Sequence, residues 1–270
     1  MSEANYNEYL SGDRSADMIP ADVSAVVVSH DGFSDVWPGF FGLLFRFWPD
    51  LPYPLHLISN HLSFTHKRII PLRVGDDLSW SETLARGLEC ISSRFVLLML
   101  EDFFLTAPVD SAHVGHLHAA MVAKGAVYLR LVPLPAADVP CPDMPDIGLI
   151  AKGAPYRTSL QIAFWDRLAL LNLLRPDESA WDFELKGSRR SDRVSELFLS
   201  VREGISAISY RQVVQRGKWL PDAVRQFRAL GVQFDCSSRP VESEIYLLWQ
   251  TSAPRLFLGR AWRFVTRRSI

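Results

Sequence analysis

Phe95-Val-Leu-Leu-Met-Leu-Glu-Asp-Phe-Phe-Leu105 joins six consecutive apolar residues directly to two acids. Such a run has the length of a fully buried β-strand and is too short to span a bilayer. Glu101 and Asp102 end the run, because a carboxylate is costly to bury unless it is paired or bound to a metal. The segment therefore predicts a buried strand that stops at two acids, although an exposed turn with incidental acids would show the same pattern.

Three further strands are predicted upstream of this segment. Residues 23–29 form a β-branched run of strand length, and 55–59 and 69–74 are shorter runs. Large apolar residues at helical spacing predict one helix over 37–48. A second helix is predicted to follow Ser79, which forms a capping-box pattern with the glutamate three residues later.

The order strand–helix–strand–strand–helix–strand predicts an α/β fold. The expected architecture is a mostly parallel, Rossmann-like central sheet with helices on both faces. In such sheets ligands bind beyond the carboxyl ends of the strands. His30-Asp31-Gly32 and Glu101-Asp102 follow two of the predicted strands, so they are candidates for the ligand site.

The second half of the chain is less regular. A cluster of prolines predicts an irregular loop over 133–145, and Gly231 is the expected stop of a short helix. The remaining predicted elements are helix 114–122, strand 126–132, strand 160–165 with a helix to 174, helix 194–201 and helix 221–230.

Length and composition are typical of a globular protein. With 270 residues, 48 % of them hydrophobic, it can build one large α/β domain without staples. Three widely spaced cysteines without a C-x-x-C motif argue against a disulfide framework and a structural zinc site. The first twenty residues are polar, so we expect a flexible leader without a secretory signal and a cytoplasmic protein.

Charge is distributed unevenly along the chain. The last twenty residues carry five arginines and no acid, which leaves a net charge of −6 on the first 250. The acidic body argues against nucleic-acid binding. The end itself predicts a basic amphipathic helix that either contacts an anionic membrane surface or docks on the domain. Its arginines are Arg255, Arg260, Arg263, Arg267 and Arg268.

Several segments resemble GT-A-type glycosyltransferases, especially bacterial enzymes of surface-polysaccharide synthesis. Residues 95–105 resemble the strand and acidic motif of that group, and Val26-Val-Val-Ser-His-Asp-Gly-Phe-Ser-Asp35 is similar to its first strand and nucleotide-side loop. The other similar segments are Trp80-Ser81-x-x-Leu84, Ser179-Ala-Trp-Asp-Phe-Glu184 and Arg216-Gly-Lys-Trp219. The resemblance implies a leader over 1–20, a GT-A-like catalytic domain over 21–235 and a basic helical extension over 236–270.

The resemblance also implies a metal and a nucleotide-sugar site. Asp102 matches the metal-binding last position of the acidic motif and would hold Mn²⁺ or Mg²⁺, with Glu101 beside it. Where the usual motif is Asp-x-Asp, this chain has Leu100 at the first position. His30 and Asp31 are expected near the nucleotide.

Asp76 and Asp77 are also expected to reach the nucleotide, while turn formation is the alternative role for all four loop residues. Arg216 and Lys218 are expected to meet the diphosphate as it gains charge, and a solvated turn is the alternative. Three histidines, His113, His116 and His118, are predicted to lie on the surface, because their spacing does not place all three on one helix face.

Glu184 is the candidate general base. Its two aromatic neighbours predict partial desolvation, which raises a carboxylate pKa toward the range useful for a base. The alternative is an acid at the start of a helix near Ser179, where negative charge favours the helix dipole. Asp182 is the second candidate for the same role.

These expectations describe a metal-dependent glycosyltransferase. It would move a sugar from a nucleoside-diphosphate donor to a hydroxyl of a glycan or lipid-linked acceptor in surface-polysaccharide synthesis. A nucleotidyltransferase on a similar fold and a non-catalytic carbohydrate-binding or assembly protein are the alternatives. No G-x-G-x-x-G, Walker or G-x-S-x-G motif is present, which disfavours dehydrogenases, NTPases and hydrolases.

Overall fold

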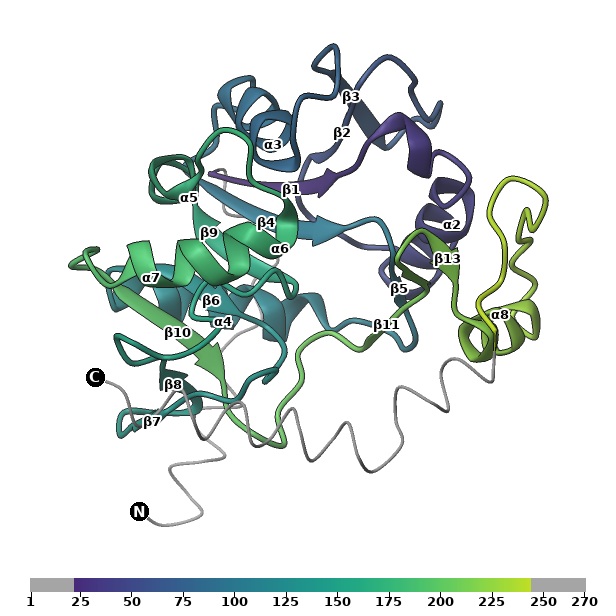
Figure 1. Cartoon of the computed structure of the whole chain (residues 1–270). Helices are drawn as coiled ribbons and strands as arrows, with labels where there is room; N and C mark the ends of the chain where they lie inside the picture. The colour runs from purple at the N-terminus through teal and green to yellow at the C-terminus, as the bar shows by residue number, and fades with distance from the viewer. Residues whose placement is uncertain (1–21, 244–270) are drawn as a thin grey trace. The chain divides into compact units, whose positions relative to one another are not determined.

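The computed structural model describes residues 22–243 (Figure 1). The predicted leader and most of the predicted C-terminal extension lie outside the described residues. The chain forms two compact units that are interleaved along the sequence. Unit 1 runs to His30 and adds Asp50–Leu100 and Val109–Ile208, while unit 2 comprises Asp31–Pro49, Glu101–Pro108 and the residues from Ser209 onward. The division into a leader, a catalytic domain over 21–235 and an extension stays a prediction.

Unit 1 is built on a nine-stranded sheet with the order β3-β2-β1-β4-β9-β6-β10-β8-β7. Its strands are β1 Val23–Val28, β2 Leu55–Ser59, β3 Ile69–Arg73, β4 Phe95–Leu100, β6 Ala126–Arg130, β7 Val139–Cys141, β8 Met144–Leu149, β9 Ala163–Asp166 and β10 Leu197–Val201. The four strands from β3 to β4 are parallel, and β6 and β10 run in the same direction. Only β9 and β8 run against the other strands described here. The predicted α/β class with a mostly parallel sheet is confirmed.

The two apolar strands at the middle of this sheet explain its stability. All six residues of β1 are buried, and five of the six in β4 are buried. Their register pairs Val23 with Phe95 and Val28 with Leu100, so both strands end in step. Because parallel strands covered on both faces need continuous apolar sequence, these two runs could be read directly from the sequence.

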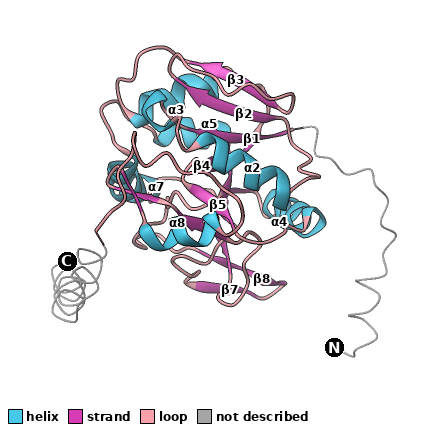
Figure 2. Ribbon diagram, turned by 90° about the vertical axis from the view of Figure 1, so that its right-hand side faces the viewer, coloured by secondary structure: helices cyan, strands magenta, loops and turns pink. Residues whose placement is uncertain are grey.

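Helices of unit 1 cover both faces of the sheet, as predicted. They are α3 Trp80–Glu89, α4 Ser111–Ala123, α5 Arg167–Leu173, α6 Ala180–Asp182, the π-helical η2 Phe183–Gly187 and α7 Ser188–Ser191. One core cluster joins Val96 and Leu98 of β4 to residues of α3, α5 and η2. Phe95, on the alternate face of β4, contacts His118 of α4. Figure 2 distinguishes the helices in cyan from the strands in magenta.

Local signals for helix α3 are confirmed. The Ser79 side chain accepts a hydrogen bond from the Glu82 backbone N–H at 3.2 Å, and its hydroxyl donates to the Glu82 carboxylate at 2.8 Å. Leu84 and Leu88 are fully buried on the face that the spacing predicted. An N-cap of this kind stabilises a helix by about 1 kcal/mol.

Two predictions for the second half of the chain are wrong. Residues 194–201 were predicted as a helix, but residues Leu197–Val201 form strand β10 between β6 and β8. A short apolar run fits both periodicities, and here pairing within the sheet decides. The predicted irregular loop over 133–145 instead contains β7 and the start of β8, with Pro140 tolerated because β7 is an edge strand.

Unit 2 contains short elements around an aromatic core. Its elements are the 3-10 helix η1 Asp31–Phe33, α2 Trp37–Phe47, β5 Phe103–Leu105, β11 Tyr210–Gln212, β12 Val214–Gln215, β13 Lys218–Trp219 and α8 Pro221–Arg228. Strand β11 pairs antiparallel with β5. Phe104 of β5 contacts the rings of Phe227 and Phe234, and a Cβ at Gly39 of α2 would lie 2.7 Å from it. Glycine therefore lets α2 lie close to β5.

His118 corrects the prediction of three surface histidines. His118 is 4 % exposed, and the centre of its ring lies 4.9 Å from that of Phe95 and 4.8 Å from that of Phe164. The Nε2 atom has no hydrogen-bond partner among the described residues. Burial lowers the pKa of His118 to about 4, although the negative charge of Asp22 acts to raise it.

We expect unit 1 to lose stability in acid because of His118. The unfolded chain binds a proton near pH 6.5, whereas the folded chain binds it only near pH 4, so stability is lost as the pH falls between these values. The loss is about 2–3 kcal/mol. Urea unfolding at pH 8 and pH 4.5 should show it, and His118→Met should reduce it. An equal acid sensitivity in His118→Met would contradict the assignment.

Candidate active site

Two acids directly follow β4 in the chain and begin a segment of unit 2. Glu101 is 7 % exposed and Asp102 is 8 % exposed, so both carboxylates are largely removed from water. The Asp102 carbonyl accepts a hydrogen bond from the Val213 backbone N–H at 2.9 Å, which extends the pairing of β5 with β11. The local sheet therefore fixes the backbone that carries Asp102.

The Asp102 carboxylate has a neutral hydrogen-bond donor. Gln212 Nε2, from β11, donates to Oδ2 at 3.0 Å. Burial raises the pKa of Asp102 to about 6, while the bond from Gln212 and the positive charge of Arg239 act in the opposite direction. Burial therefore disfavours the charged form of the Asp102 carboxylate.

The acids suit a hard divalent cation that is shared with a substrate. Carboxylate oxygens are ligands for Mg²⁺ and Mn²⁺, and such ions often take one or two carboxylates together with substrate phosphates. No group of three or more His, Cys, Asp or Glu residues within 22–243 forms a closed metal cage.

Arg239 connects three parts of unit 2. Its guanidinium donates to both Asp35 carboxylate oxygens at 2.9 Å, to the Gly32 carbonyl at 2.8 Å and to the Gly217 carbonyl at 3.1 Å. The side chain is 7 % exposed and also lies 4.2 Å from the centre of the Phe33 ring. This residue, which the sequence analysis missed, joins the loop that follows Asp31 to the turn between Arg216 and Lys218.

That turn has the backbone of a tight hairpin. Arg216 and Gly217 have φ values of +52° and +74°, as the two central residues of a type I′ turn require. Lys218 lies 3.1 Å from Glu242. The backbone of this segment therefore forms the turn that was the alternative to phosphate binding. The contact of the Arg216 and Lys218 side chains with the diphosphate stays a prediction.

Residues predicted to contact the nucleotide fall into both units. His30 is half-buried after β1 in unit 1, and Asp31 begins η1 in unit 2. Asp76 is exposed and lies 2.9 Å from His61 Nε2, while Asp77 accepts a hydrogen bond from Thr83 in the first turn of α3. The structure thus gives Asp77 a contact with the helix start.

A cavity lies at the carboxyl ends of β2 and β3. It measures about 310 Å³ and is lined by Asn60, His61, Arg73 and Gly75. The Asn60 amide donates to the Gly75 carbonyl at 3.1 Å, and Gly75 has a φ of +84°, which favours glycine. Asp76, through His61, therefore adjoins this cavity in unit 1.

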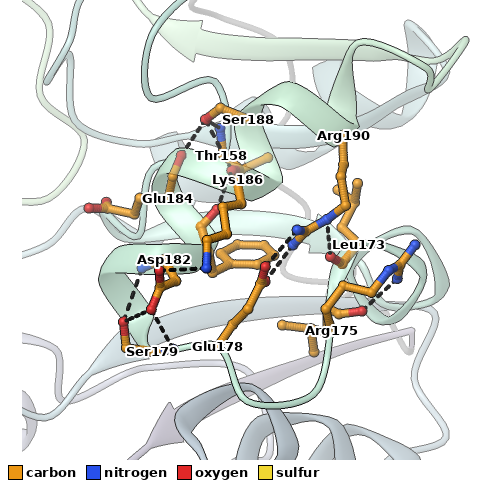
Figure 3. Close-up of polar contacts among 12 residues, drawn as sticks. Thr158, Leu173, Arg175, Glu178, Ser179, Asp182, Glu184, Lys186, Ser188 and Arg190 are labelled. Carbon is orange, nitrogen blue, oxygen red and sulfur yellow. Dashed lines mark hydrogen bonds and ion pairs between the residues drawn. The ribbon is translucent and has the colours of Figure 1, made fainter.

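The two candidate bases lie on one helical segment but differ in their contacts (Figure 3). The Asp182 carboxylate accepts hydrogen bonds from the Ser179 hydroxyl and backbone N–H and lies 2.8 Å from Lys186. Lys186 and Ser179 lower the pKa of Asp182 to about 2. Asp182 therefore forms the capping box that begins α6.

Glu184 has a different environment. Its Oε1 accepts a hydrogen bond from the Leu160 backbone N–H at 2.7 Å. Burial raises the pKa of Glu184, while the bonds from Leu160 and Ser159 and the charge of Arg130 act to lower it. Figure 3 shows its carboxylate pointing away from the Asp182–Lys186 and Glu178–Arg190 pairs. The predicted direction of the shift is confirmed, although one of the two flanking aromatics, Trp181, is 60 % exposed.

The C-terminal arginines Arg255, Arg260, Arg263, Arg267 and Arg268 lie outside the described residues. Within 22–243, no helix is both long enough and apolar enough to cross a bilayer. The predicted membrane contact of the C-terminus therefore stays a prediction.

Comparisons with known proteins give structural neighbours. The sequence matches no protein-family model and no curated protein. The similar solved structures include S. aureus TarS residues 1–349 in complex with UDP-GlcNAc, with 9 % identity and a TM-score of 0.49, covering 73 % of this chain and 60 % of that chain. A longer TarS structure has 10 % identity and a TM-score of 0.46, covering 77 % of this chain and 39 % of that chain.

A cytidylyltransferase is also similar. The 2-C-methyl-D-erythritol 4-phosphate cytidylyltransferase from Thermus thermophilus has 14 % identity and a TM-score of 0.46, covering 78 % of this chain and all of that chain. The chain spans 60 % or less of the length of these TarS structures. At these identities the likeness concerns the fold alone.

Proposed function

We propose that this chain is a metal-dependent glycosyltransferase that uses a nucleoside-diphosphate sugar as its donor. The acceptor would be a hydroxyl of a glycan or of a lipid-linked acceptor in surface-polysaccharide synthesis. The observation that carries the proposal is the burial of Glu101 and Asp102 at 7 % and 8 % exposure directly after an apolar strand. Carboxylates that lose their hydration gain most from a bound cation.

In unit 2, Asp102 would hold Mn²⁺ or Mg²⁺, and Glu101 would adjoin it. A bound divalent ion would neutralise charge on the diphosphate of the donor. Arg216 and Lys218 would stabilise the leaving nucleoside diphosphate, and Asp31 would contact its nucleoside. Arg239 would be a positioning residue. It donates to the carbonyl of Gly32, next to Asp31, and to that of Gly217, between Arg216 and Lys218, rather than to the substrate.

In unit 1, Glu184 would act as the general base. The acceptor oxygen forms a bond to the anomeric carbon while the bond from that carbon to the diphosphate oxygen breaks. The electron pair of the broken bond leaves with the nucleoside diphosphate, and the proton of the acceptor hydroxyl moves to Glu184. His30, Asp76 and Asp77 stay the predicted nucleotide contacts within unit 1.

The contacts of the two acids favour Glu184 over Asp182. A general base works best with a pKa near the operating pH. Burial moves the pKa of Glu184 upward, whereas hydrogen bonds to Lys186 and Ser179 hold that of Asp182 at about 2. Asp182 would mainly support the start of α6.

The expected location is cytoplasmic, with the C-terminal arginines contacting an anionic membrane surface. Such a contact would bring the enzyme to a lipid-linked acceptor.

The metal assignment is tested with Asp102→Asn. We expect UDP, GDP, CMP or dTDP to raise the melting temperature of the wild-type protein, and Mn²⁺ to increase that shift. Asp102→Asn should lose the Mn²⁺-dependent part, because an amide is a weaker ligand for a hard cation than a carboxylate. Asp50→Asn, at an exposed acid in unit 1, is the matched control.

An unchanged Mn²⁺-dependent shift in Asp102→Asn would remove Asp102 from the metal site. The wild-type protein, incubated with UDP- and GDP-sugars, should hydrolyse the donor slowly. Release of pyrophosphate from CTP and a sugar phosphate, without donor hydrolysis, would instead identify a nucleotidyltransferase. Glycan binding without either reaction would indicate a non-catalytic carbohydrate-binding protein.

A further inference from the structure

One tryptophan in unit 1 is exposed beside the candidate base. Trp181 is 60 % exposed, whereas Trp37, Trp48, Trp165 and Trp219 are each no more than 2 % exposed. An exposed indole does not contribute the free energy of hydrophobic burial to folding, so its exposure is typical of a binding surface. The Tyr156 ring lies 6.1 Å from it at an angle of 65°. The two rings form an aromatic pair that we call the Trp181–Tyr156 platform.

The backbone under Tyr156 is strained and firmly held. Tyr156 has a φ of +55°, which is unfavourable for a side chain of its size. Its carbonyl accepts hydrogen bonds from the Ser159 backbone N–H and from Arg130, both at 3.1 Å, and Arg130 is fully buried. Strain of this kind persists where the surroundings determine the conformation, and it is frequent at functional sites.

The segment that follows Tyr156 is attached to the helical segment that carries Trp181 and Glu184. Thr158 Oγ1 donates to the Phe183 carbonyl at 3.3 Å, and its backbone N–H donates to Ser188 at 3.1 Å. Leu160 then donates its N–H to Glu184 at 2.7 Å. The chain from Tyr156 to Leu160 therefore contacts Trp181 at one end and Glu184 at the other.

Spacing along the helical segment places the two functional groups on neighbouring positions. Trp181 lies in α6 and Glu184 lies three residues later, in the helical turn that follows. The segment continues as the π-helix Phe183–Gly187, and single π-helical turns frequently occur at functional sites. One helical segment therefore carries both the exposed indole and the candidate base.

We propose that the Trp181–Tyr156 platform binds a pyranose ring of the acceptor, so that the acceptor ends in a sugar rather than in a simple alcohol. This inference rests on the proposed function, since it supplies the hydroxyl that Glu184 deprotonates. The C–H face of the sugar covers the Trp181 indole and removes its apolar area from water. A sugar hydroxyl then donates a hydrogen bond to Glu184.

The charge of the site favours a sugar over a lipid surface. A carboxylate oxygen accepts hydrogen bonds, so Glu184 suits a hydroxyl donor, and an ionised carboxylate would repel an anionic headgroup. The neighbouring Glu178 and Asp182 are already matched by Arg190 and Lys186. A neutral, hydroxyl-rich ligand therefore fits the described surroundings of the platform best.

Glycan binding without donor tests the platform separately from catalysis. We would apply the full chain to a printed array of bacterial surface glycans and measure the bound oligosaccharides by saturation-transfer NMR. Trp181→Ala should weaken binding about two- to tenfold, the range that aromatic contacts typically contribute beyond area burial. Trp181→Phe should retain part of the affinity. Tyr156→Asn should weaken binding while tolerating the positive φ.

The matched control is Leu168→Ala, which removes an equally exposed apolar side chain, also 60 % exposed, from α5 of unit 1. It should leave glycan binding unchanged. In activity assays, Trp181→Ala should raise the acceptor KM and leave the donor KM unchanged.

The outcomes separate this inference from the proposed function. Glycan binding that depends on Trp181, in a protein that neither binds nucleotides nor hydrolyses donors, would retain the platform and overturn the transferase. No glycan bound by the wild-type protein, or equal binding by Trp181→Ala, would overturn the platform. Trp181-dependent binding to phosphatidylserine vesicles without glycan binding would assign the surface to a membrane and also overturn it.

Discussion

Glu184→Gln is expected to lower kcat by about 10²–10⁴-fold, the usual contribution of a general base. The amide keeps the shape of the side chain and can still accept the Leu160 N–H through its oxygen, so the fold should persist. It cannot take the proton of the acceptor hydroxyl. Donor binding should be nearly unchanged, as measured by the nucleotide-dependent thermal shift.

The pH dependence of kcat gives a second readout for Glu184. Because burial raises its pKa, the active carboxylate form is lost at a higher pH than for an ordinary glutamate. In the wild-type enzyme kcat should therefore rise with pH through a midpoint above 4.5, and Glu184→Gln should lack this rise.

Asp182→Asn is the matched comparison, and it should affect kcat less than Glu184→Gln. Its main effect should be a weaker capping box at α6. Full kcat in Glu184→Gln together with a large loss in Asp182→Asn would make Asp182 the base. Full kcat in both variants would require a mechanism other than inverting displacement with a carboxylate base.

The strands β1 and β4 could be predicted from sequence, because strands that are buried on both faces consist almost entirely of apolar residues. β4 is a continuous apolar run with the predicted bounds, and in β1 only Ser24 interrupts the apolar residues. β10 was predicted as a helix because Val194, Leu197, Phe198 and Val201 also fit a helical period. Its identity depends on pairing with Tyr128 and its neighbours in β6, about 70 residues away, which local periodicity does not contain.

The candidate site was predictable only in part. Glu101 and Asp102 could be identified because charge interrupts an apolar run. Gln212, which donates to Asp102, is 110 residues distant and has no local pattern that marks it. The raised pKa of Glu184 was predicted in direction but for an incomplete reason, because one of the two flanking aromatics, Trp181, is exposed. Burial of the carboxylate raises the pKa, while the hydrogen bond from the Leu160 N–H lowers it.

Arg239→Met is expected to destabilise unit 2 by about 3–5 kcal/mol, as is typical when one partner of a buried ion pair is removed. The guanidinium donates to both oxygens of Asp35, and the Asp35 side chain is 13 % exposed. Removing Arg239 also takes a donor from the Gly32 and Gly217 carbonyls. Urea unfolding followed by tryptophan fluorescence should report the loss, since Trp37, Trp48 and Trp219 belong to unit 2.

The double variant Arg239→Met/Asp35→Leu separates loss of packing from the cost of an uncompensated charge. If the buried charge of Asp35 causes the loss, the double variant should recover much of the stability of the single variant, because replacing both partners of a buried pair is often close to neutral. Arg239→Lys keeps the charge but cannot donate to all of its partners, so an intermediate loss is expected. A change below about 1 kcal/mol in Arg239→Met, the range of exposed ion pairs, would show that Arg239 does not hold unit 2 together.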